Sequence, residues 1–336
     1  MVAAVRIVFF GTPDFAVPSL EGLIASAHTV VGVVTQPDRP RGRGQRVTES
    51  PVKATARAHG IPVLQPDRLR DPETMAALAA WSPDLGVVAA YGKLIPAEML
   101  ALPRHGMINV HASLLPKYRG AAPVHRAVMN GDTETGVTIM RVVPALDAGG
   151  MLARVRRPIG PDETSVEVER DLARLGVGPL LAVIDQLAQG TAHEEPQDES
   201  QATYAPRLTK EEGLIDWTLP APAIHNRVRG LHPWPHAYTF LDGARLIVLN
   251  SRVAESARGS AQGSDPGSDP GSDPGSDPPP GTVVEVGRDR LVVAAGRGTR
   301  LAVLEVQAEG RRAMTVREFL AGRPIAPGTR LGARSQ

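Results

Sequence analysis

The chain contains no cysteine, which excludes disulfide bonds, zinc–cysteine sites, iron–sulfur clusters and a cysteine nucleophile. Such a protein needs no oxidising compartment, and we expect it in the cytoplasm. No apolar run approaches the roughly 18 residues that a membrane helix requires. Arg6 interrupts the first apolar run, and Gly11 and the Thr-Pro-Asp that follows end it. Neither a signal peptide nor a membrane partner is therefore expected.

Common cofactor signatures are absent too. Neither GxxxxGKS/T nor GxGxxG occurs, which argues against a P-loop enzyme and against the usual dinucleotide site. No HExxH occurs, and the nine histidines lack metal-ligand spacing, so we expect no metal. An NAD-dependent oxidoreductase, which a parallel sheet alone would allow, lacks its glycine fingerprint.

The first half of the chain alternates short apolar runs with helical patterns. Strands are predicted at residues 5–10, 30–35, 85–91, 107–110 and 136–143. Helices are predicted at residues 18–26, 52–58, 72–81 and 165–189. Near-continuous apolar strands between amphipathic helices predict an α/β domain with a mostly parallel sheet that is covered on both faces.

The length of 336 residues, about twice that of a typical domain, predicts two domains. Residues 190–206 are polar, acidic and poor in core residues, which predicts a linker. We therefore expect a catalytic domain at 1–189 and a second domain at 207–336. Short β-branched segments separated by turn residues predict a small antiparallel β-barrel of the oligonucleotide-binding (OB) type there.

The net charge of +1 conceals an excess of basic residues in 207–336. This excess favours a polyanion-binding module beside a catalytic one, although a solvated arginine-rich surface is an equal alternative. Residues 263–278 are four exact copies of Gly-Ser-Asp-Pro, followed by two prolines. We expect a disordered insert at 259–280, which is better explained as tolerated loop expansion than as a functional element.

Residues 107–120 read MINVHASLLPKYRG, and LDAGG follows at 146–150. Asn109 and His111 lie two residues apart and so on one side of a strand, and Asp147 adds a carboxylate in a glycine-rich turn. An amide, an imidazole and a carboxylate suit acyl transfer to an amine, since the amide stabilises an oxyanion while the other groups move the proton. From these residues alone, purely structural roles remain the alternative.

The segments NVHASLLPKYRGAAP and LDAGG resemble the signature of the 10-formyltetrahydrofolate-dependent transformylases. The resemblance implies a Rossmann-like, doubly wound fold and 10-formyltetrahydrofolate as the formyl donor. It implies catalytic roles for Asn109, His111 and Asp147, and folate contacts by Ser113, Leu114, Leu115 and Pro116.

Further segments are similar to the methionyl-tRNA formyltransferase family, in the same order over nearly the whole chain. They include FFGTPDFAVPSL, VVTQPDRPRGRGQ, AYGKLIP, YAPRLTKEEGLIDW, VRGLHPWPHAY and QAEGRRAMTVREFLAG. The similarity implies formylation of the α-amino group of methionine on initiator tRNA, for translation initiation. Nothing in the sequence requires more than a monomer. The alternatives are a formyltransferase acting on an amino-sugar nucleotide or other small amine, and a non-enzymatic nucleic-acid-binding protein.

A basic loop at residues 36–53 has no apolar anchors, which predicts an arm that binds nucleic acid. In the family this loop enters the acceptor end of tRNA. The expected tRNA contacts are Arg39, Arg41, Arg43, Arg46, Lys53, Arg311 and Arg312. Further candidate phosphate contacts in the second domain are Arg227, Arg229, Arg245 and Arg317. Trp217 and Trp234 are expected to be buried anchors rather than stacking platforms.

Overall fold

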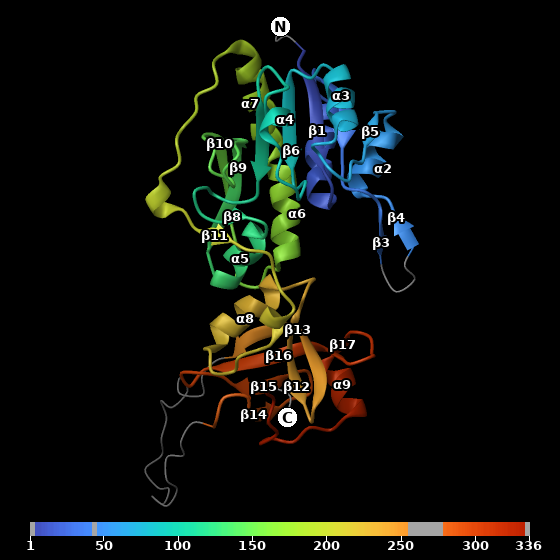
Figure 1. Ribbon diagram of the computed structural model, residues 1–336. Coiled ribbons are helices and arrows are strands. Elements are labelled where there is room, and N and C mark those ends of the chain that lie inside the picture. Colours follow the sequence, from blue (N-terminus) through green and yellow to red (C-terminus); the bar gives the residue numbers. More distant parts are fainter. Residues whose placement is uncertain (1–3, 42–45, 255–277, 333–336) are drawn as a thin grey trace, which may run out of the picture. The chain divides into compact units, whose positions relative to one another are not determined.

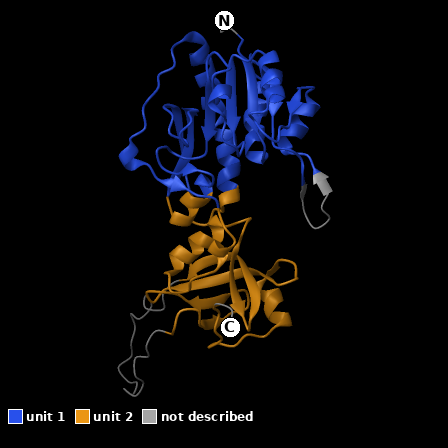
Figure 2. Ribbon diagram, in the orientation of Figure 1, with its two compact units in different colours: residues 1–124, 133–159, 167–207 blue, residues 125–132, 160–166, 208–336 orange. Residues whose placement is uncertain are grey.

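The computed structural model describes residues 4–41, 46–254 and 278–332. The chain forms two compact units, shown in different colours in Figure 2. Unit 1 comprises residues 1–124, 133–159 and 167–207, and unit 2 comprises 125–132, 160–166 and 208–336. Residues 190–206, predicted as a linker, lie in unit 1. Among the described residues, no helix combines the length and apolar character that crossing a bilayer requires.

The main sheet of unit 1 has the strand order β10-β9-β7-β6-β1-β2-β5 (Figure 1). The strands are β1 (Arg6–Gly11), β2 (Thr29–Val34), β5 (Val63–Leu64), β6 (Leu85–Ala89), β7 (Met107–His111), β9 (Glu134–Arg141) and β10 (Met151–Pro158). The five strands from β5 to β7 are parallel, whereas β9 and β10 are antiparallel to their neighbours. The prediction of a mostly parallel, Rossmann-like sheet is therefore confirmed.

Both faces of this sheet are covered. Four successive residues of β1, from Ile7 to Phe10, are buried, although neighbouring side chains in a strand point to opposite faces. On one face, Val8 and Phe10 share a hydrophobic cluster with residues of α3 and α4. The helices of unit 1 are α1 (Val17–Ile24), α2 (Pro51–Ala58), α3 (Pro72–Ala80), α4 (Ala97–Leu100), α6 (Ser165–Leu175) and α7 (Val177–Gln189); the first residues of α6 belong to unit 2.

The predicted helix at 165–189 is in fact two helices, α6 and α7, with a break at Gly176. Pro179 explains the break: inside a continuous helix its ring would clash with the carbonyl of residue 175, and it has no N–H to donate. The structure places Pro179 in the first turn of α7, where the missing donor costs little. A Cβ on Gly176 would lie 3.2 Å from side-chain atoms of Val110 and Val137, so glycine lets the junction pack closely on the sheet.

Unit 2 contains an antiparallel sheet in the order β12-β13-β16-β15-β14, with β17 added to β16. Its elements are α8 (Ala221–Gly230), β12 (Ala237–Leu241), β13 (Ala244–Ala254), β14 (Val283–Val286), β15 (Leu291–Ala294), β16 (Arg300–Ala308), β17 (Met314–Thr315) and α9 (Val316–Gly322). Residues 329–332 join the two edge strands: Val283 N donates to Thr329 O at 2.8 Å, and Phe240 N donates to Gly332 O at 2.9 Å. The sheet is thereby closed, which confirms the predicted antiparallel β-barrel.

The two tryptophans named above differ in burial. Trp217 is 5% exposed and donates its indole N–H to Thr239 Oγ1 at 3.1 Å, as expected of a core residue. Trp234 is 49% exposed, so the prediction that it is a buried anchor is wrong. Most of the predicted insert at 259–280 lies outside the described residues, between Ala254 at the end of β13 and the segment that leads into β14.

Candidate active site

The predicted catalytic residues of the NxH pattern lie at the end of β7. Asn109 pairs with Met140 of β9, and His111, the last residue of β7, pairs with Thr138. Because they are two positions apart on one strand, their side chains leave the same face of the sheet. His111 is 5% exposed, whereas Asn109 is half-buried. Carboxyl ends of parallel strands are where α/β enzymes build their sites.

The structure brings Asp147, from the loop between β9 and β10, next to His111. The Nδ1 atom of His111 lies 3.7 Å from Asp147 Oδ2, within the range of an ion pair but beyond that of a hydrogen bond. The other ring nitrogen, Nε2, lies 2.9 Å from the carbonyl oxygen of Tyr118. A carbonyl only accepts hydrogen bonds, so Nε2 carries a proton and Nδ1 is the nitrogen free to exchange one.

Asp147 is held in an uncommon backbone conformation. Its φ of +46° lies in the left-handed region, which is unfavourable for a residue with a side chain. Its Oδ2 atom accepts a 2.7 Å hydrogen bond from the backbone N–H of Gly120. Gly120 itself has φ +120°, and a Cβ there would meet the carbonyl oxygen of Ala205 at 2.8 Å, so only glycine fits.

The loop that carries Asp147 is also held by side chains that the sequence analysis did not identify as part of the site. Gln197 Nε2 donates to the carbonyl oxygens of Asp147 (2.7 Å) and Gly149 (2.8 Å). Arg119 donates in turn to Gln197 Oε1 and to both carboxylate oxygens of Glu199. The Arg119 hydrogen bonds lower the pKa of the Glu199 carboxyl, and Glu199 raises the pKa of the guanidinium. Gln197 and Glu199 escaped prediction because their polar segment has the composition of a linker.

Asn109 is left available for a substrate. No group in the described parts of the chain makes a hydrogen bond with its side-chain amide. An amide at the end of β7 with free donors can bind an oxygen that acquires negative charge. Within the part of the chain that the structure describes, no group of three or more His, Asp or Glu is arranged to hold a metal ion.

The segment predicted to bind folate is partly used for internal support. The Ser113 hydroxyl donates to Lys117 O at 2.6 Å, and Leu115 packs in a buried cluster with Met140 and Met151. Leu114 and Pro116 are only half-buried. Ser113 and Leu115 therefore shape the segment, while Leu114 and Pro116 have surface left for a ligand.

The predicted arm at 36–53 contains a short antiparallel pair, β3 (Arg39–Arg41) and β4 (Arg46–Thr48). Arg39 is exposed. Lys53 lies at the base of the arm, where its Nζ atom is 2.5 Å from Asp38 Oδ2 and 2.7 Å from Gln65 Oε1, and its hydrogen bond lowers the pKa of Asp38. Lys53 thus anchors the arm. Arg43 and the side chains of Arg41 and Arg46 lie outside the described residues.

Of the predicted basic contacts of unit 2, Arg311, Arg312 and Arg317 are exposed, whereas Arg227 and Arg245 are half-buried. Arg229 is 5% exposed and donates to the carbonyl oxygens of Gly160 and Glu163, so it is a buried residue rather than a surface contact for phosphate. Arg311 and Arg312 follow β16, and Arg312 forms a 2.9 Å ion pair with Glu318.

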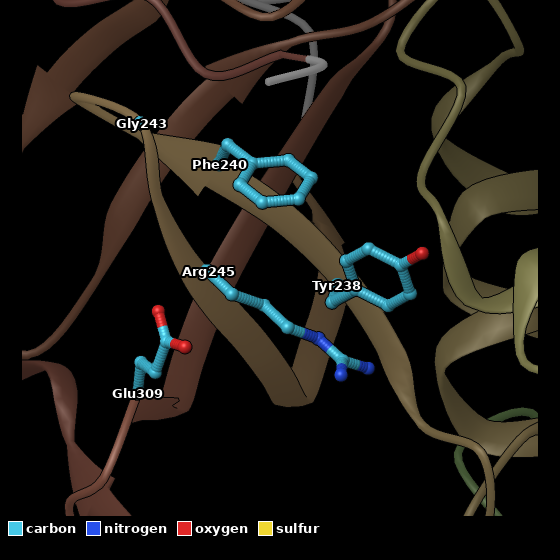
Figure 3. Close-up of a pocket in the computed structure, with 5 residues that line it drawn as sticks. All are labelled: Tyr238, Phe240, Gly243, Arg245 and Glu309. Atoms are coloured by element: carbon cyan, nitrogen blue, oxygen red, sulfur yellow. The ribbon is translucent and has the colours of Figure 1, made fainter.

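Figure 3 shows a hollow of about 240 Å³ in unit 2, lined by Tyr238, Phe240, Gly243, Arg245 and Glu309. The guanidinium carbon of Arg245 lies 3.9 Å from the centre of the Tyr238 ring. The Tyr238 and Phe240 rings are nearly perpendicular, with centres 5.9 Å apart. An arginine stacked on an aromatic ring offers both a cation and flat surfaces, as nucleic-acid binding requires.

Together these features define an enzyme class. The chain matches the formyl transferase family over residues 5–184 and the formyl transferase C-terminal domain over residues 207–324. The chain, with a Rossmann-like sheet followed by a β-barrel, is therefore a formyl transferase.

Two relatives narrow the class. The methionyl-tRNA formyltransferase of Moorella thermoacetica is 47% identical over 97% of this chain and 99% of its own. That of Geobacter sulfurreducens is 45% identical over 98% of each chain. The protein belongs to the methionyl-tRNA formyltransferase family, which confirms the resemblance inferred from the sequence.

Solved structures agree on the fold. The N-formyltransferase from Helicobacter canadensis, in complex with folinic acid and dTDP-3-aminofucose, superposes with a TM-score of 0.63 at 14% identity, over 89% of this chain and 99% of that one. HypX from Aquifex aeolicus, in complex with tetrahydrofolic acid, gives 0.59 at 15% identity, over 95% of this chain and 47% of that one. At such low identity these likenesses support the fold alone.

Proposed function

We propose that this protein transfers the formyl group of 10-formyltetrahydrofolate to the α-amino group of methionine on initiator tRNA, for translation initiation. The observation that carries this proposal is the identity of about 45% to methionyl-tRNA formyltransferases over nearly the full length of both chains. An amino-sugar acceptor has support only from distant relatives that share the fold.

In this reaction the amine nitrogen attacks the formyl carbon, a new C–N bond forms, and the bond to N10 of the folate breaks. The formyl oxygen carries negative charge in the tetrahedral intermediate. Asn109 is the donor proposed for that oxygen, because its amide has no partner within the described chain.

The attacking nitrogen must lose a proton, and N10 must gain one. We assign this transfer to Nδ1 of His111, since Nε2 is held by the Tyr118 carbonyl. The Asp147 carboxylate, 3.7 Å from Nδ1, stabilises the imidazolium that forms. Its hydrogen bond from Gly120 keeps the carboxylate facing the ring.

Folate binding is assigned to the segment 113–116. A pterin ring needs apolar walls and backbone polar groups. The half-buried Leu114 and Pro116 supply apolar surface, and the internal hydrogen bonds of Ser113 and the packing of Leu115 keep the segment in place. The folate-bound neighbours from Aquifex aeolicus and Helicobacter canadensis share this fold, which supports a folate site in it.

We assign tRNA binding to the basic arm, including Arg39, and to unit 2, including Arg311, Arg312 and the arginine–aromatic surface around Arg245. The protein acts in the cytoplasm, where charged tRNA is used. We propose that it acts as a monomer, which light scattering at working concentration measures directly.

The deciding experiment compares wild type, Asn109→Ala and Asp147→Ala in formyl transfer to methionyl initiator tRNA. Loss of an oxyanion donor typically costs about 10²–10³ in rate, which is the loss of turnover expected of Asn109→Ala. Loss of a group that assists proton transfer costs about 10²–10⁴, which is the loss expected of Asp147→Ala. The Kd for folate should be unchanged in both variants. An amino-sugar nucleotide serves as the competing acceptor. Formylation of the sugar but not of the tRNA by the wild type would contradict the proposed function, and near-normal turnover of either variant would contradict its site.

A further inference from the structure

We propose that residues 195–205, here named the strap, position the catalytic carboxylate, and that Gln197 is the positioning residue through which they act. The inference rests on the proposed function, since it concerns the loop that carries Asp147. No substrate or folate contact is assigned to Gln197, because its amide oxygen accepts from Arg119 and its NH₂ group donates to the carbonyl oxygens of Asp147 and Gly149.

The backbone of the strap is bound at both ends to the segments that form the site. At one end, Glu195 and Met151 exchange backbone hydrogen bonds of 2.7 and 2.8 Å, just after the Asp147 loop. At the other end, β11 (Tyr204–Ala205) pairs with β8 (Arg119–Gly120) in parallel. The strap therefore joins the loop that carries Asp147 to the segment whose Gly120 N–H binds the Asp147 carboxylate.

Between these ends, the Gln197 amide fixes the backbone around Asp147. Its NH₂ group donates to the carbonyl oxygens of Asp147 and Gly149, which lie on both sides of residue 148. Asp147 holds a left-handed φ of +46°, and a loop in such a conformation persists only where the surroundings hold it. The two bonds from Gln197 supply that restraint on the carbonyl side, while Gly120 supplies it on the carboxylate.

Arg119 decides which way the Gln197 amide points. A guanidinium only donates hydrogen bonds, so the amide oxygen must face Arg119, and the NH₂ group must face the two carbonyls. Arg119 is 2% exposed, and its charge is balanced by Glu199, whose side chain is 70% exposed. A chain of hydrogen bonds thus runs from the surface through Glu199, Arg119 and Gln197 to Asp147.

The chemistry at position 197 requires an amide. A carboxylate of the same shape could still accept from Arg119, but its second oxygen would face two carbonyl oxygens and would have nothing to donate. Gln197→Glu therefore removes the restraint on Asp147 while it preserves the size of the side chain and the partner of Arg119.

The test measures kcat and KM for both substrates in Gln197→Glu, with Gln201→Glu as the matched control. Gln201 lies in the same strap, but among the described residues its amide bonds only the exposed Asp198. We expect kcat of Gln197→Glu to fall about 10- to 100-fold, since small displacements of catalytic groups have effects of this size. KM for folate should stay within twofold, and Gln201→Glu should match the wild type in every parameter.

Two further measurements separate positioning from general damage. In an Asp147→Asn background, Gln197→Glu should lower kcat no further, because it acts through Asp147. Hydrogen exchange should be faster in Gln197→Glu than in Gln201→Glu at Gly120 and in residues 147–150. If Gln197→Glu does not fold, Glu199→Gln weakens the same chain from its exposed end, and kcat should fall by a smaller factor with unchanged KM.

Unchanged kcat in Gln197→Glu, an equal loss in Gln201→Glu, or a full further loss in the Asp147→Asn background would each overturn the proposal. These results differ from a failure of the proposed function, in which the wild type itself would not formylate methionyl-tRNA. The hydrogen-exchange comparison decides the positioning role in that case as well, because it needs no turnover.

Discussion

At the scale of single residues, the neighbours of a side chain decide what it can do. The Tyr118 carbonyl is bonded to Nε2 of His111, so Nδ1, which faces Asp147, is the nitrogen left for the proton transfer proposed above. Asn109 is two positions away on the same strand and makes no hydrogen bond with any described group. The same residue type can thus have a structural or a catalytic role, and its hydrogen-bond partners distinguish the two.

A second histidine, His225, differs from His111 because both of its ring nitrogens have partners within the protein. His225 of α8 is 7% exposed, with Nδ1 3.1 Å from Ser251 Oγ and Nε2 3.0 Å from Pro161 O. Burial disfavours the charged ring and lowers the pKa of His225 below its ordinary value of 6.5. The nearby Asp162 opposes this shift, while Arg229 and Arg252 add to it.

We predict a pH dependence of stability from this residue. The unfolded chain binds the proton more readily than the folded chain, so the contribution of His225 is complete above pH 6.5 and decreases as the pH falls toward the lowered, folded-state pKa. Denaturant unfolding of wild type and His225→Gln at pH 7.5 and 5.5 measures it. The wild type should lose more stability than the variant between the two values, and equal losses would contradict the prediction.

At the scale of elements, two segments with little apolar content have different structures. The strap is bound by backbone pairs at both ends and is part of unit 1, whereas the arm is a short β3–β4 pair whose base is fixed by Lys53 and Asp38. Both are polar in sequence, so composition alone does not separate the element proposed to support the site from the one proposed to bind tRNA.

For the arm we predict that the double substitution Arg41→Ala and Arg43→Ala weakens use of tRNA but not of folate. Each lost phosphate contact removes about 0.7–0.9 from the slope of log affinity against log salt, so the double variant should lose roughly 1.5. Kinetics over a range of salt concentrations measure the slope. Arg57→Ala is the matched control, because Arg57 is exposed on α2 and pairs with Glu49. An unchanged slope in the double variant would reject the arm as a tRNA contact.

At the scale of the whole molecule, the two units have separate hydrophobic cores. The proposed function gives both units one partner, the tRNA, while folate concerns unit 1 alone. Changes in unit 2 should therefore alter tRNA affinity without altering the chemistry.

Arg245→Ala tests this division of roles. Stacking on a base is worth about 1–3 kcal/mol, so loss of the Arg245–Tyr238 surface should raise KM for tRNA about fivefold or more and leave KM for folate unchanged. Arg323→Ala is the control, since the Arg323 side chain in unit 2 is 41% exposed and pairs with Asp242. Combined with the arm substitutions, the effects on log KM for tRNA should add, because the residues lie on separate units. An equal effect of both unit 2 variants would show that charge alone is responsible.

The sequence by itself determined the alternation of strands and helices, the β-barrel of the second half, and the placement of Asn109 and His111 on one face of a strand. Each of these follows from local rules: apolar periodicity, turn residues and the two-residue repeat of a strand. The resemblance to formyltransferases supplied Asp147, which its glycine-rich turn alone could not distinguish from a structural aspartate.

Only the tertiary structure decided how the carboxylate is held. Gly120 and Asp147 are 27 positions apart, Gln197 and Asp147 are 50 apart, and Arg119 and Gln197 are 78 apart. A local pattern carries no information over such separations, and the polar segment at 190–206 therefore had the composition of a linker. The strap can be recognised only from the tertiary structure, because its hydrogen bonds, such as those between β8 and β11, join segments from different parts of the chain.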